Sequence, residues 1–216
     1  KKINVDKDWL NLSYKERNNL SFEEQIGLLK GNELPVSSFL DRMNGMYPGG
    51  TTKFEKRDVA ENVPCWIREN CIECNQCAFV CPHGVIRPYL LENDDKYENA
   101  IPSLMPKDKK FAIGISYEDC TGCGLCANIC PGKAGNKALE MNKYDKTKFK
   151  NDEVDYLNKN KVNYESKLVN VKNLEFTEPK FEYSGACAGC GETAYIKNLT
   201  QLFNDNLIIA NATGCS

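Results

Sequence analysis

Apolar residues are sparse in the first part of the chain, and the structural signals there are local. Ser21-Phe22-Glu23-Glu24 has the S-x-x-E form of a capping box, and Gly31 supplies a stop. Together they predict a short helix from Phe22 to Lys30. Prolines and glycines between positions 35 and 50 then indicate irregular connecting chain. We therefore assign residues 1–60 to an N-terminal connecting segment.

The middle of the chain alternates between short apolar runs and turns. Short strands are predicted around residues 65–67 and 111–115, with a loop or hairpin extension over residues 91–110 between them. Lys, Asn, Asp and Glu dominate residues 143–180, where no glycine occurs. That composition favours a solvated linker with some helical or extended pieces. The predicted boundaries are therefore 61–142 for a compact domain and 143–180 for a charged linker.

Residues 181–216 have a different pattern, which predicts the start of a further domain. Apolar side chains recur there with the period of a helix, so Thr193 to Asn204 is predicted to be helical. After a polar turn, Leu207–Ala210 is a short apolar run that suits a buried parallel strand. The apolar residues with helical period are Tyr195, Ile196, Leu199, Leu202 and Phe203.

Composition adds an excess of thiols, since 12 of the 216 residues are cysteine and only one is histidine. Lys and Arg number 28 against 30 Asp and Glu, a net charge of −2 that argues against a nucleic-acid binder or a polybasic membrane-surface protein. A chain of this length with 41% hydrophobic residues can build a core without cysteine staples. The thiols are therefore predicted to be ligands or catalysts.

The sequence shows neither a signal peptide nor a transmembrane segment. Residues 1–10 contain no apolar stretch after their basic start, and no run of about 18 apolar residues occurs anywhere. Without an export signal a disulfide framework loses its main support, so we expect the cytoplasm or an equivalent reducing compartment of an anaerobe. Lys1 is not a methionine and Ser216 directly follows a glycine-cysteine loop, so we expect a fragment of a longer chain.

An internal repeat organises the compact domain. Four cysteines and a proline recur at one constant offset, each set having the form C-x2-C-x2-C-x3-C-P. The repeat predicts two copies of one supersecondary unit with approximate two-fold symmetry, each with a short helix after its fourth cysteine. The two sets are Cys71, Cys74, Cys77, Cys81 and Pro82, and Cys120, Cys123, Cys126, Cys130 and Pro131.

This spacing is typical of the bacterial-type ferredoxin arrangement for [4Fe–4S] clusters. Three thiolates two residues apart lie on a tight loop that can wrap one corner of a cube, and the fourth cysteine ligates the other cluster in two-cluster proteins. Gly122 and Gly124 let the backbone approach the cluster sulfurs closely. The predicted ligand sets are Cys71, Cys74, Cys77 and Cys130 for one cluster, and Cys120, Cys123, Cys126 and Cys81 for the other.

Other uses of these cysteines explain less of the pattern. Zinc takes four ligands and gives no reason for a third cysteine and a Cys-Pro in both copies. Disulfides and a thioredoxin-type C-x-x-C are disfavoured by the number and spacing of the thiols. Cys65 falls outside the register and is predicted to be a buried or semi-buried free thiol. We expect a structural imidazole at His83 and a surface guanidinium at Arg87.

A third group of cysteines accompanies glycine-rich loops near the end of the chain. Ser184–Glu192 packs three glycines and two cysteines before the predicted helix, and Asn211–Ser216 follows the predicted strand. Loops in these positions are where an α/β fold receives an anionic cofactor. Their cysteines, Cys187, Cys190 and Cys215, are one short of a [4Fe–4S] set.

The sequence resembles the pyruvate:ferredoxin (or flavodoxin) oxidoreductases, which use thiamine diphosphate and iron–sulfur clusters. The segments that carry the resemblance are the two cysteine sets with Cys81-Pro82-His83 and Ile86-Arg87-Pro88, Pro131-Gly132-Lys133, Asn136-Lys137-Ala138-Leu139, Ser184–Glu192, Asn211–Ser216, Leu34-Pro35-Val36-Ser37 and Phe54-Glu55-Lys56-Arg57. The resemblance implies that Cys187, Cys190 and Cys215 hold a third cluster with a downstream cysteine. It also implies that Glu192 and Cys215 contact thiamine diphosphate, which binds with Mg²⁺ in the full-length parent.

The fold class expected is therefore α+β: a two-[4Fe–4S] ferredoxin-like domain with pseudo-two-fold repeat and long extensions, followed by the first loop, helix and strand of an α/β thiamine-diphosphate domain. The resemblance implies that this chain is the electron-relay segment of a longer, homodimeric enzyme. That parent enzyme would oxidise pyruvate with coenzyme A and reduce ferredoxin or flavodoxin, and the segment alone would be inactive. A stand-alone two-cluster ferredoxin and a relative acting on another 2-oxoacid are the alternatives. Neither nucleic acid nor membrane is expected as a partner.

Overall fold

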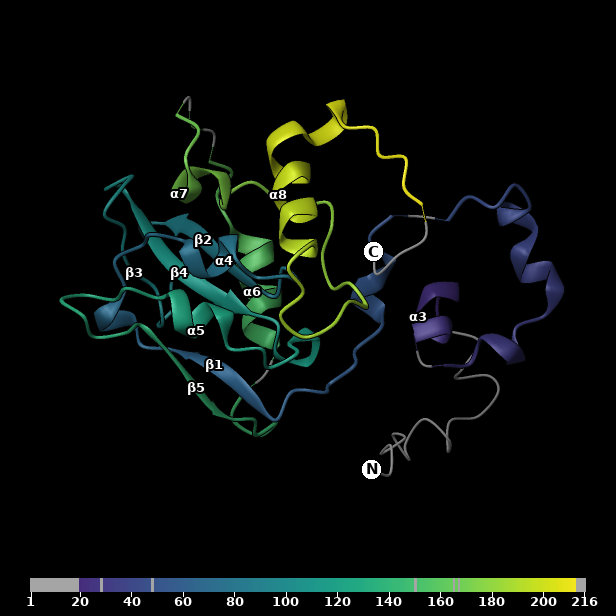
Figure 1. Ribbon diagram of the computed structural model, residues 1–216, viewed down its shortest axis with the longest axis horizontal. Helices are drawn as coiled ribbons and strands as arrows, with labels where there is room; N and C mark the ends of the chain where they lie inside the picture. The colour runs from purple at the N-terminus through teal and green to yellow at the C-terminus, as the bar shows by residue number, and fades with distance from the viewer. Residues whose placement is uncertain are drawn as a thin grey trace. The chain divides into compact units, whose positions relative to one another are not determined.

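The computed structural model describes residues 20–27, 29–47, 49–149, 151–164, 166 and 168–212. Two compact units divide the chain, residues 1–56 and residues 57–216, and each is described by itself (Figure 1). Among the described residues, no helix is long and apolar enough to cross a membrane.

The first unit contains the predicted capped helix, which begins at Phe22 as expected but ends before the predicted Lys30. Helix α3 spans Phe22–Gly27. The Glu24 amide donates to Ser21 Oγ at 3.1 Å, and the Ser21 amide donates to Glu24 Oε2 at 2.7 Å, which confirms the capping box. The helix ends at Gly27, where a Cβ atom would lie 2.4 Å from the Phe54 carbonyl oxygen, so only glycine fits there. The other elements of this unit are 3₁₀ helices at Gly31–Glu33, Val36–Arg42 and Thr51–Phe54.

The second unit is built around two small antiparallel sheets. One sheet pairs β1 with β5, and the other has the order β2-β4-β3. The pairing of β2 with β4 runs from Ile86 opposite Ile115 to Glu92 opposite Lys109, so residues 91–110 do form a hairpin extension. The strand predicted at 111–115 is confirmed. The strands are β1 (Asn62–Trp66), β2 (Ile86–Glu92), β3 (Ile101–Pro102), β4 (Lys109–Ile115) and β5 (Leu139–Lys143).

The short helices of the two cysteine repeats lie elsewhere than predicted. Helix α4 (Gln76–Phe79) and helix α5 (Leu125–Ile129) each contain the third cysteine of their set and end before the fourth. The prediction of a helix after the fourth cysteine is therefore wrong. Asn75 and Gly124 cap these helices with left-handed backbone, at φ 58° and 77°, and so turn the chain into a helix early. A proline after the fourth cysteine prevents the helix from continuing.

The core lies between the sheets and the cysteine loops, and α6 covers the far face of β2 and β4. The main core contains Val63, Ile86, Leu90, Phe111 and Leu139. Helix α6 (Asp152–Asn160) buries Leu157 completely in a second cluster with strand residues. Gly114 makes room for it, because a Cβ atom there would lie 3.0 Å from Leu157 Cδ1. The solvated linker expected over residues 143–180 is thus packed structure in this part.

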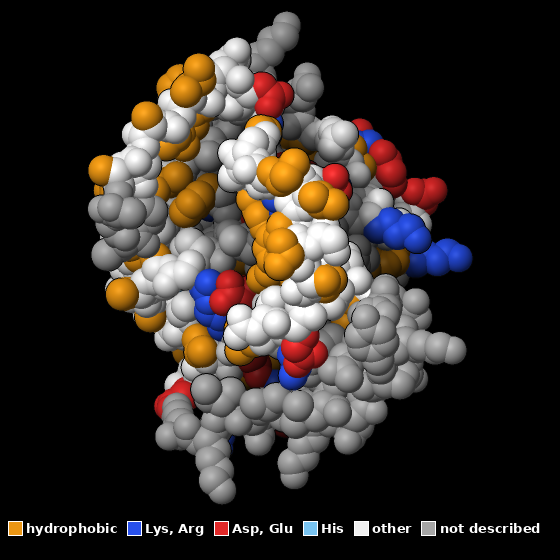
Figure 2. All heavy atoms as spheres, turned by 90° about the vertical axis from the view of Figure 1, so that its right-hand side faces the viewer, with side chains coloured by type: hydrophobic (Ala, Val, Ile, Leu, Met, Phe, Trp, Pro, Cys, Tyr) orange, Lys and Arg blue, Asp and Glu red, His pale blue; other side chains and the backbone are white. Residues whose placement is uncertain are grey.

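The last helix matches its predicted span, and the face that it buries is polar. Helix α8 (Thr193–Phe203) buries a polar face made by Thr193, Lys197, Asn198, Thr200 and Gln201. Most of its large apolar side chains are exposed instead. Figure 2 shows other hydrophobic side chains, in orange, on the side of the molecule that it views. The exposed ones on α8 are Tyr195, Leu199, Leu202 and Phe203.

The strand expected at Leu207–Ala210 is not formed. Residues 207–210 have no strand structure, and Ile208 is 95% exposed. A strand needs a neighbour to satisfy its amides and carbonyls, and none of the described strands lies alongside it. Helix α7 (Val171–Leu174) and 3₁₀ helices at Arg68–Asn70, Tyr117–Asp119 and Asn204–Asn206 complete the unit.

Replacing Leu157 with Ala should lower the free energy of unfolding by about 2–5 kcal/mol, because it leaves a cavity between α6 and the sheet. Urea unfolding under anaerobic conditions, followed by tryptophan fluorescence, measures the change. Lys159→Ala on the exposed face of the same helix should alter the midpoint by less than about 0.5 kcal/mol. Equal effects of the two variants would mean that α6 is not packed as described.

Candidate metal centre

Four cysteines from both repeats line one cavity, which we call the first cavity. Cys71, Cys74 and Cys77 come from the first repeat, and Cys130 comes from the second. The empty space among these residues, including the part open to solvent, is about 350 Å³. Its remaining walls are mostly apolar and are formed by Trp66, Ile72, Asn75, Ile113, Gly132, Ala138 and Leu139.

The second cavity repeats this arrangement with the roles of the two repeats exchanged. Cys120, Cys123 and Cys126 come from the second repeat, and Cys81 comes from the first. The empty space is again about 350 Å³. The other lining residues are Pro64, Pro82, His83, Val85, Ile86, Thr121, Gly124, Leu125 and Met141.

The exchange follows from the short helices. Cys77 lies within α4 and Cys81 lies two residues after its end, so one turn of chain carries one sulfur to each cavity. Helix α5 does the same with Cys126 and Cys130. The structure therefore brings the eight cysteines together in the two groups of four that the sequence predicts as ligand sets. Cys65 lies on β1 as a half-buried free thiol and lines neither cavity.

Burial controls the protonation of these thiols. It raises the pKa of Cys120 to about 11 and that of Cys126 to about 12, and neighbouring thiols add to both shifts. Backbone amides oppose the rise: the Gly122 amide donates to Cys120 Sγ at 3.4 Å, and the Ala127 amide lowers the pKa of Cys126. Without a bound cation these sulfurs are neutral thiols, and a bound metal would release their protons.

These cavities fit a polynuclear iron–sulfur group better than a single ion. All described cysteines are free, so no disulfide uses them. Four soft sulfurs spread around an apolar space, with amides directed at sulfur, match the surroundings of a [4Fe–4S] cube.

His83 and Arg87 follow the first Cys-Pro and are both buried. His83 is 2% exposed, and its Nδ1 lies 3.2 Å from both the carbonyl oxygen and Oγ of Ser184, which confirms a structural imidazole. Burial lowers the pKa of His83. Arg87 is 9% exposed, with Nη1 3.6 Å from Glu182 Oε2, so the prediction of a surface guanidinium is wrong. The segment around Glu182 folds back and covers it.

The third cysteine group is described only in part. Cys187 and Cys190 lie in the loop before α8, and the Cys190 amide donates to the Cys187 carbonyl at 3.1 Å. Backbone amides of Glu192 and Thr193 lower the pKa of Cys190. Glu192 itself is exposed and is the N-terminal cap residue of α8. Cys215 lies outside the described residues, so its predicted place beside the other two stays a prediction.

This loop lies against the second cavity. A Cβ atom on Gly189 would be 3.6 Å from the Cβ of Cys123, which belongs to the second cavity. His83 also connects the two, since it lines the cavity and contacts Ser184 at the start of the loop. Cys187 and Cys190 are thus near the second cavity by two independent contacts.

Several buried charges near the cavities escaped the sequence reasoning. Glu73, inside the first cysteine loop, is 1% exposed and accepts from the Leu104 amide at 2.8 Å and from Lys172 Nζ at 3.2 Å. Lys197 and Glu175 form a second buried pair. The one available signal was that Glu73 occupies the repeat position of Gly122, and both have left-handed backbone, at φ 54° and 68°. An acidic residue retained at such a position indicates a specific partner.

Comparison with known proteins agrees with the cavities. A family model described as a 4Fe-4S dicluster domain matches residues 70–134. A second family model, described as a domain of unknown function, matches residues 23–60.

Three curated relatives align with most of the chain. The pyruvate:ferredoxin oxidoreductase of Moorella thermoacetica is 49% identical over 204 residues, which are 88% of this chain and 17% of that protein. The pyruvate-flavodoxin oxidoreductase of Klebsiella pneumoniae is 45% identical over 193 residues, 86% of this chain and 16% of that protein. The pyruvate-flavodoxin oxidoreductase of Trichormus variabilis is 44% identical over 202 residues, 87% of this chain and 17% of that protein. The chain therefore spans about a sixth of the length of these relatives, and it belongs to the pyruvate:ferredoxin and pyruvate-flavodoxin oxidoreductase family, within which it contains a 4Fe-4S dicluster domain.

Proposed function

We propose that residues 61–142 form an electron relay in which each cavity holds one [4Fe–4S] cluster through its four cysteines. The observation that carries the proposal is the division of eight cysteines between two separate apolar cavities, each with three from one repeat and one from the other. A [4Fe–4S] cluster supplies one-electron transfer at a potential that hydrogen bonds, charge and burial set.

The chain's own residues have clear tasks in this relay. The cysteine loops present sulfur inward, and amides such as that of Gly122 donate to sulfur and stabilise its negative charge. Ile113 and Leu139 give the first site an apolar wall, and Ile86 does the same for the second. The exchanged cysteines, Cys81 and Cys130, tie the two halves of the domain together.

The proposal extends to the whole enzyme. The relatives' names give pyruvate as substrate and ferredoxin or flavodoxin as acceptor, and this chain aligns with them over 86–88% of its length. We assign it to the segment that relays electrons from pyruvate oxidation to such an acceptor. Coenzyme A as co-substrate and a homodimeric assembly belong to the same proposal.

We also propose that the two repeats are related by a pseudo-two-fold axis. The first strand of each repeat pairs with the last strand of the other, β1 with β5 and β4 with β2, which supports this symmetry.

Residues 181–216 are proposed to begin a thiamine-diphosphate domain that holds a third cluster through Cys187, Cys190 and Cys215. Two observations support this proposal. Cys190 receives backbone amides at the start of α8, where an anionic group is stabilised. The apolar face of α8 is exposed, as expected if further chain of the longer enzyme packs on it. Glu192, exposed at the cap of α8, is available to contact the cofactor.

The full-length oxidoreductase tests the proposed activity. Purified anaerobically with pyruvate and coenzyme A, it should reduce ferredoxin or flavodoxin, and omission of either substrate should stop the reduction. A larger 2-oxoacid such as 2-oxoglutarate should give a kcat/KM at least about tenfold lower, because specificity for small side chains rests on pocket shape. A preference for the larger acid would contradict the substrate assignment.

Alanine variants test the exchange of ligands. Cys81→Ala should lose the same cluster as Cys120→Ala, and Cys130→Ala the same cluster as Cys71→Ala. Each variant should retain about four of the eight iron atoms of the two cubes, and the EPR signals of the reduced proteins should fall into these two pairs. Cys65→Ala should retain all the iron. If Cys81→Ala instead paired with Cys71→Ala, the exchange would be disproved.

After removal of the clusters, the cysteines should react with an alkylating reagent at different rates. At pH 7.5, iodoacetamide should alkylate Cys190 at least about tenfold faster than Cys120 or Cys126, because the low pKa of Cys190 and the high pKa of the buried thiols set their thiolate fractions. Labelling of Cys126 should rise about tenfold for each pH unit, since the pH stays below its pKa of about 12. Peptide mass spectrometry measures both effects. Guanidinium should remove the differences, whereas equal rates without denaturant would contradict the burial described.

A further inference from the structure

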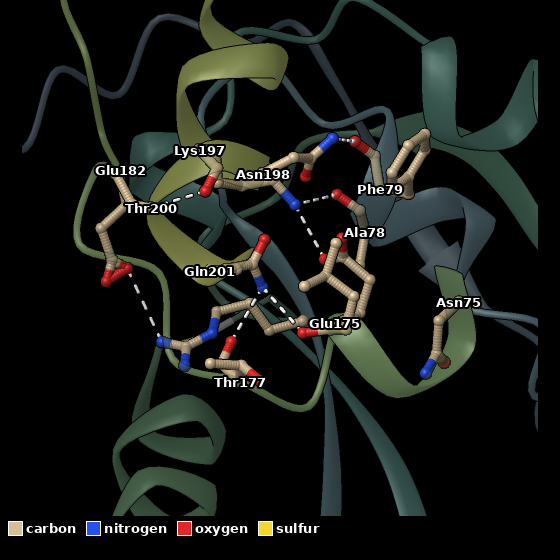
Figure 3. A network of polar contacts seen from close by, with 12 residues as sticks. Asn75, Ala78, Phe79, Glu175, Thr177, Glu182, Lys197, Asn198, Thr200 and Gln201 are labelled. Atoms are coloured by element: carbon tan, nitrogen blue, oxygen red, sulfur yellow. Dashed lines mark hydrogen bonds and ion pairs between the residues drawn. The ribbon is translucent and has the colours of Figure 1, made fainter. Parts of the chain in front are cut away.

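A buried ion pair lies beside the helix that serves both cavities. Lys197 on α8 is 2% exposed and Glu175 is 3% exposed, and Lys197 Nζ lies 2.7 Å from Glu175 Oε2. The same Nζ donates to the carbonyl oxygen of Ala78 on α4 at 2.8 Å (Figure 3). The ammonium is therefore held at a fixed place by two charge-assisted contacts.

The Ala78 carbonyl lies on the turn of chain that supplies one sulfur to each cavity. Ala78 directly follows Cys77 of the first cavity and precedes Cys81 of the second cavity by three residues. The Lys197 side chain also lies beside the second cavity, because a Cβ atom on Gly84 would be 3.7 Å from Lys197 Cδ, and Gly84 stands between His83 and Val85, which line that cavity. The field of this ammonium therefore reaches the second cavity.

Uncharged side chains also attach α8 to its neighbours. Asn198 Nδ2 also donates to the Phe79 carbonyl at 3.3 Å, and Gln201 Nε2 donates to the Thr177 carbonyl at 2.8 Å. Burying an ion pair costs desolvation energy, and well-packed apolar side chains often replace such a pair without loss of stability. Burial raises the pKa of Glu175 even though Lys197 opposes the shift. The pair thus makes at most a small net contribution to the docking of α8.

We propose that Lys197 is a positioning residue for the redox reaction, because its buried charge raises the reduction potential of the cluster in the second cavity. The negative charge of Glu175 makes this increase in potential smaller. Reduction adds one electron and hence one negative charge to the cluster, and a fixed cation in a low-dielectric site stabilises that charge. The inference rests on the cluster assignment proposed above.

Potentiometric titration followed by EPR tests the proposal on the anaerobically prepared, cluster-loaded protein, with dithionite and mediator dyes as the electron source. Lys197→Met should lower the equilibrium constant for one-electron reduction about tenfold, a shift of 59 mV. Glu175→Gln should shift the same titration step in the opposite direction, because it leaves the ammonium uncompensated. A role in docking alone would not give shifts of opposite sign.

Two further variants guard against loss of structure. The double variant K197M/E175L replaces the pair with apolar side chains and should give a potential between those of the single variants. Lys180→Met is the matched control, because it removes a lysine whose ion pair with Asp205 is exposed, and it should leave the potential unchanged.

The readouts separate this inference from the proposed function. Shifts of the same sign in the two single variants, or no shift in either, would overturn the role of Lys197, while normal iron and acid-labile sulfide contents would leave the cluster assignment standing. Absence of iron and sulfide from the unmodified protein would overturn both.

Discussion

The requirement that each apolar cavity receive a sulfur from both halves of the domain governs the rest of its structure. The third and fourth cysteines of each repeat must therefore point into different cavities although they are close in sequence. The short helices α4 and α5, of four and five residues, make this possible. The same requirement also brings the two repeats face to face, so the first strand of each pairs with the last strand of the other. The sheets need few strands, because the sulfur-lined cavities occupy part of what would otherwise be hydrophobic core.

The segment that follows the cysteine domain packs on it through apolar side chains such as Leu157 and Phe176, and ion pairs add polar contacts. Lys172 on α7 reaches Glu73 in the first cysteine loop, Lys197 on α8 reaches α4, and Arg87 faces Glu182. Ion pairs of this kind favour one geometry over others but add little net stability. This segment therefore sets the position of the Cys187–Cys190 loop beside the second cavity, while its apolar surface stays free for other partners.

Much of the site could be predicted from the sequence because the ligand cysteines stand at short, regular intervals along the chain. The repeated cysteine pattern predicted both groups of four, and the capping box predicted α3. The helices after Asn75 and Gly124 were misplaced because a left-handed backbone at one residue decides where a helix begins, and asparagine adopts that conformation in few of its occurrences. The orientation of α8 and the burial of Arg87 depend on contacts between distant segments, which no local pattern records.

The pairing of β1 with β5 has a consequence for how this domain is carried. Asn62 stands opposite Lys143 in that register, so the chain enters and leaves the cysteine domain at one edge of the same small sheet. A domain whose ends adjoin can be inserted into a loop of another protein without separating the flanking residues. The cysteine domain can therefore be joined to the rest of a longer protein through two neighbouring chain ends.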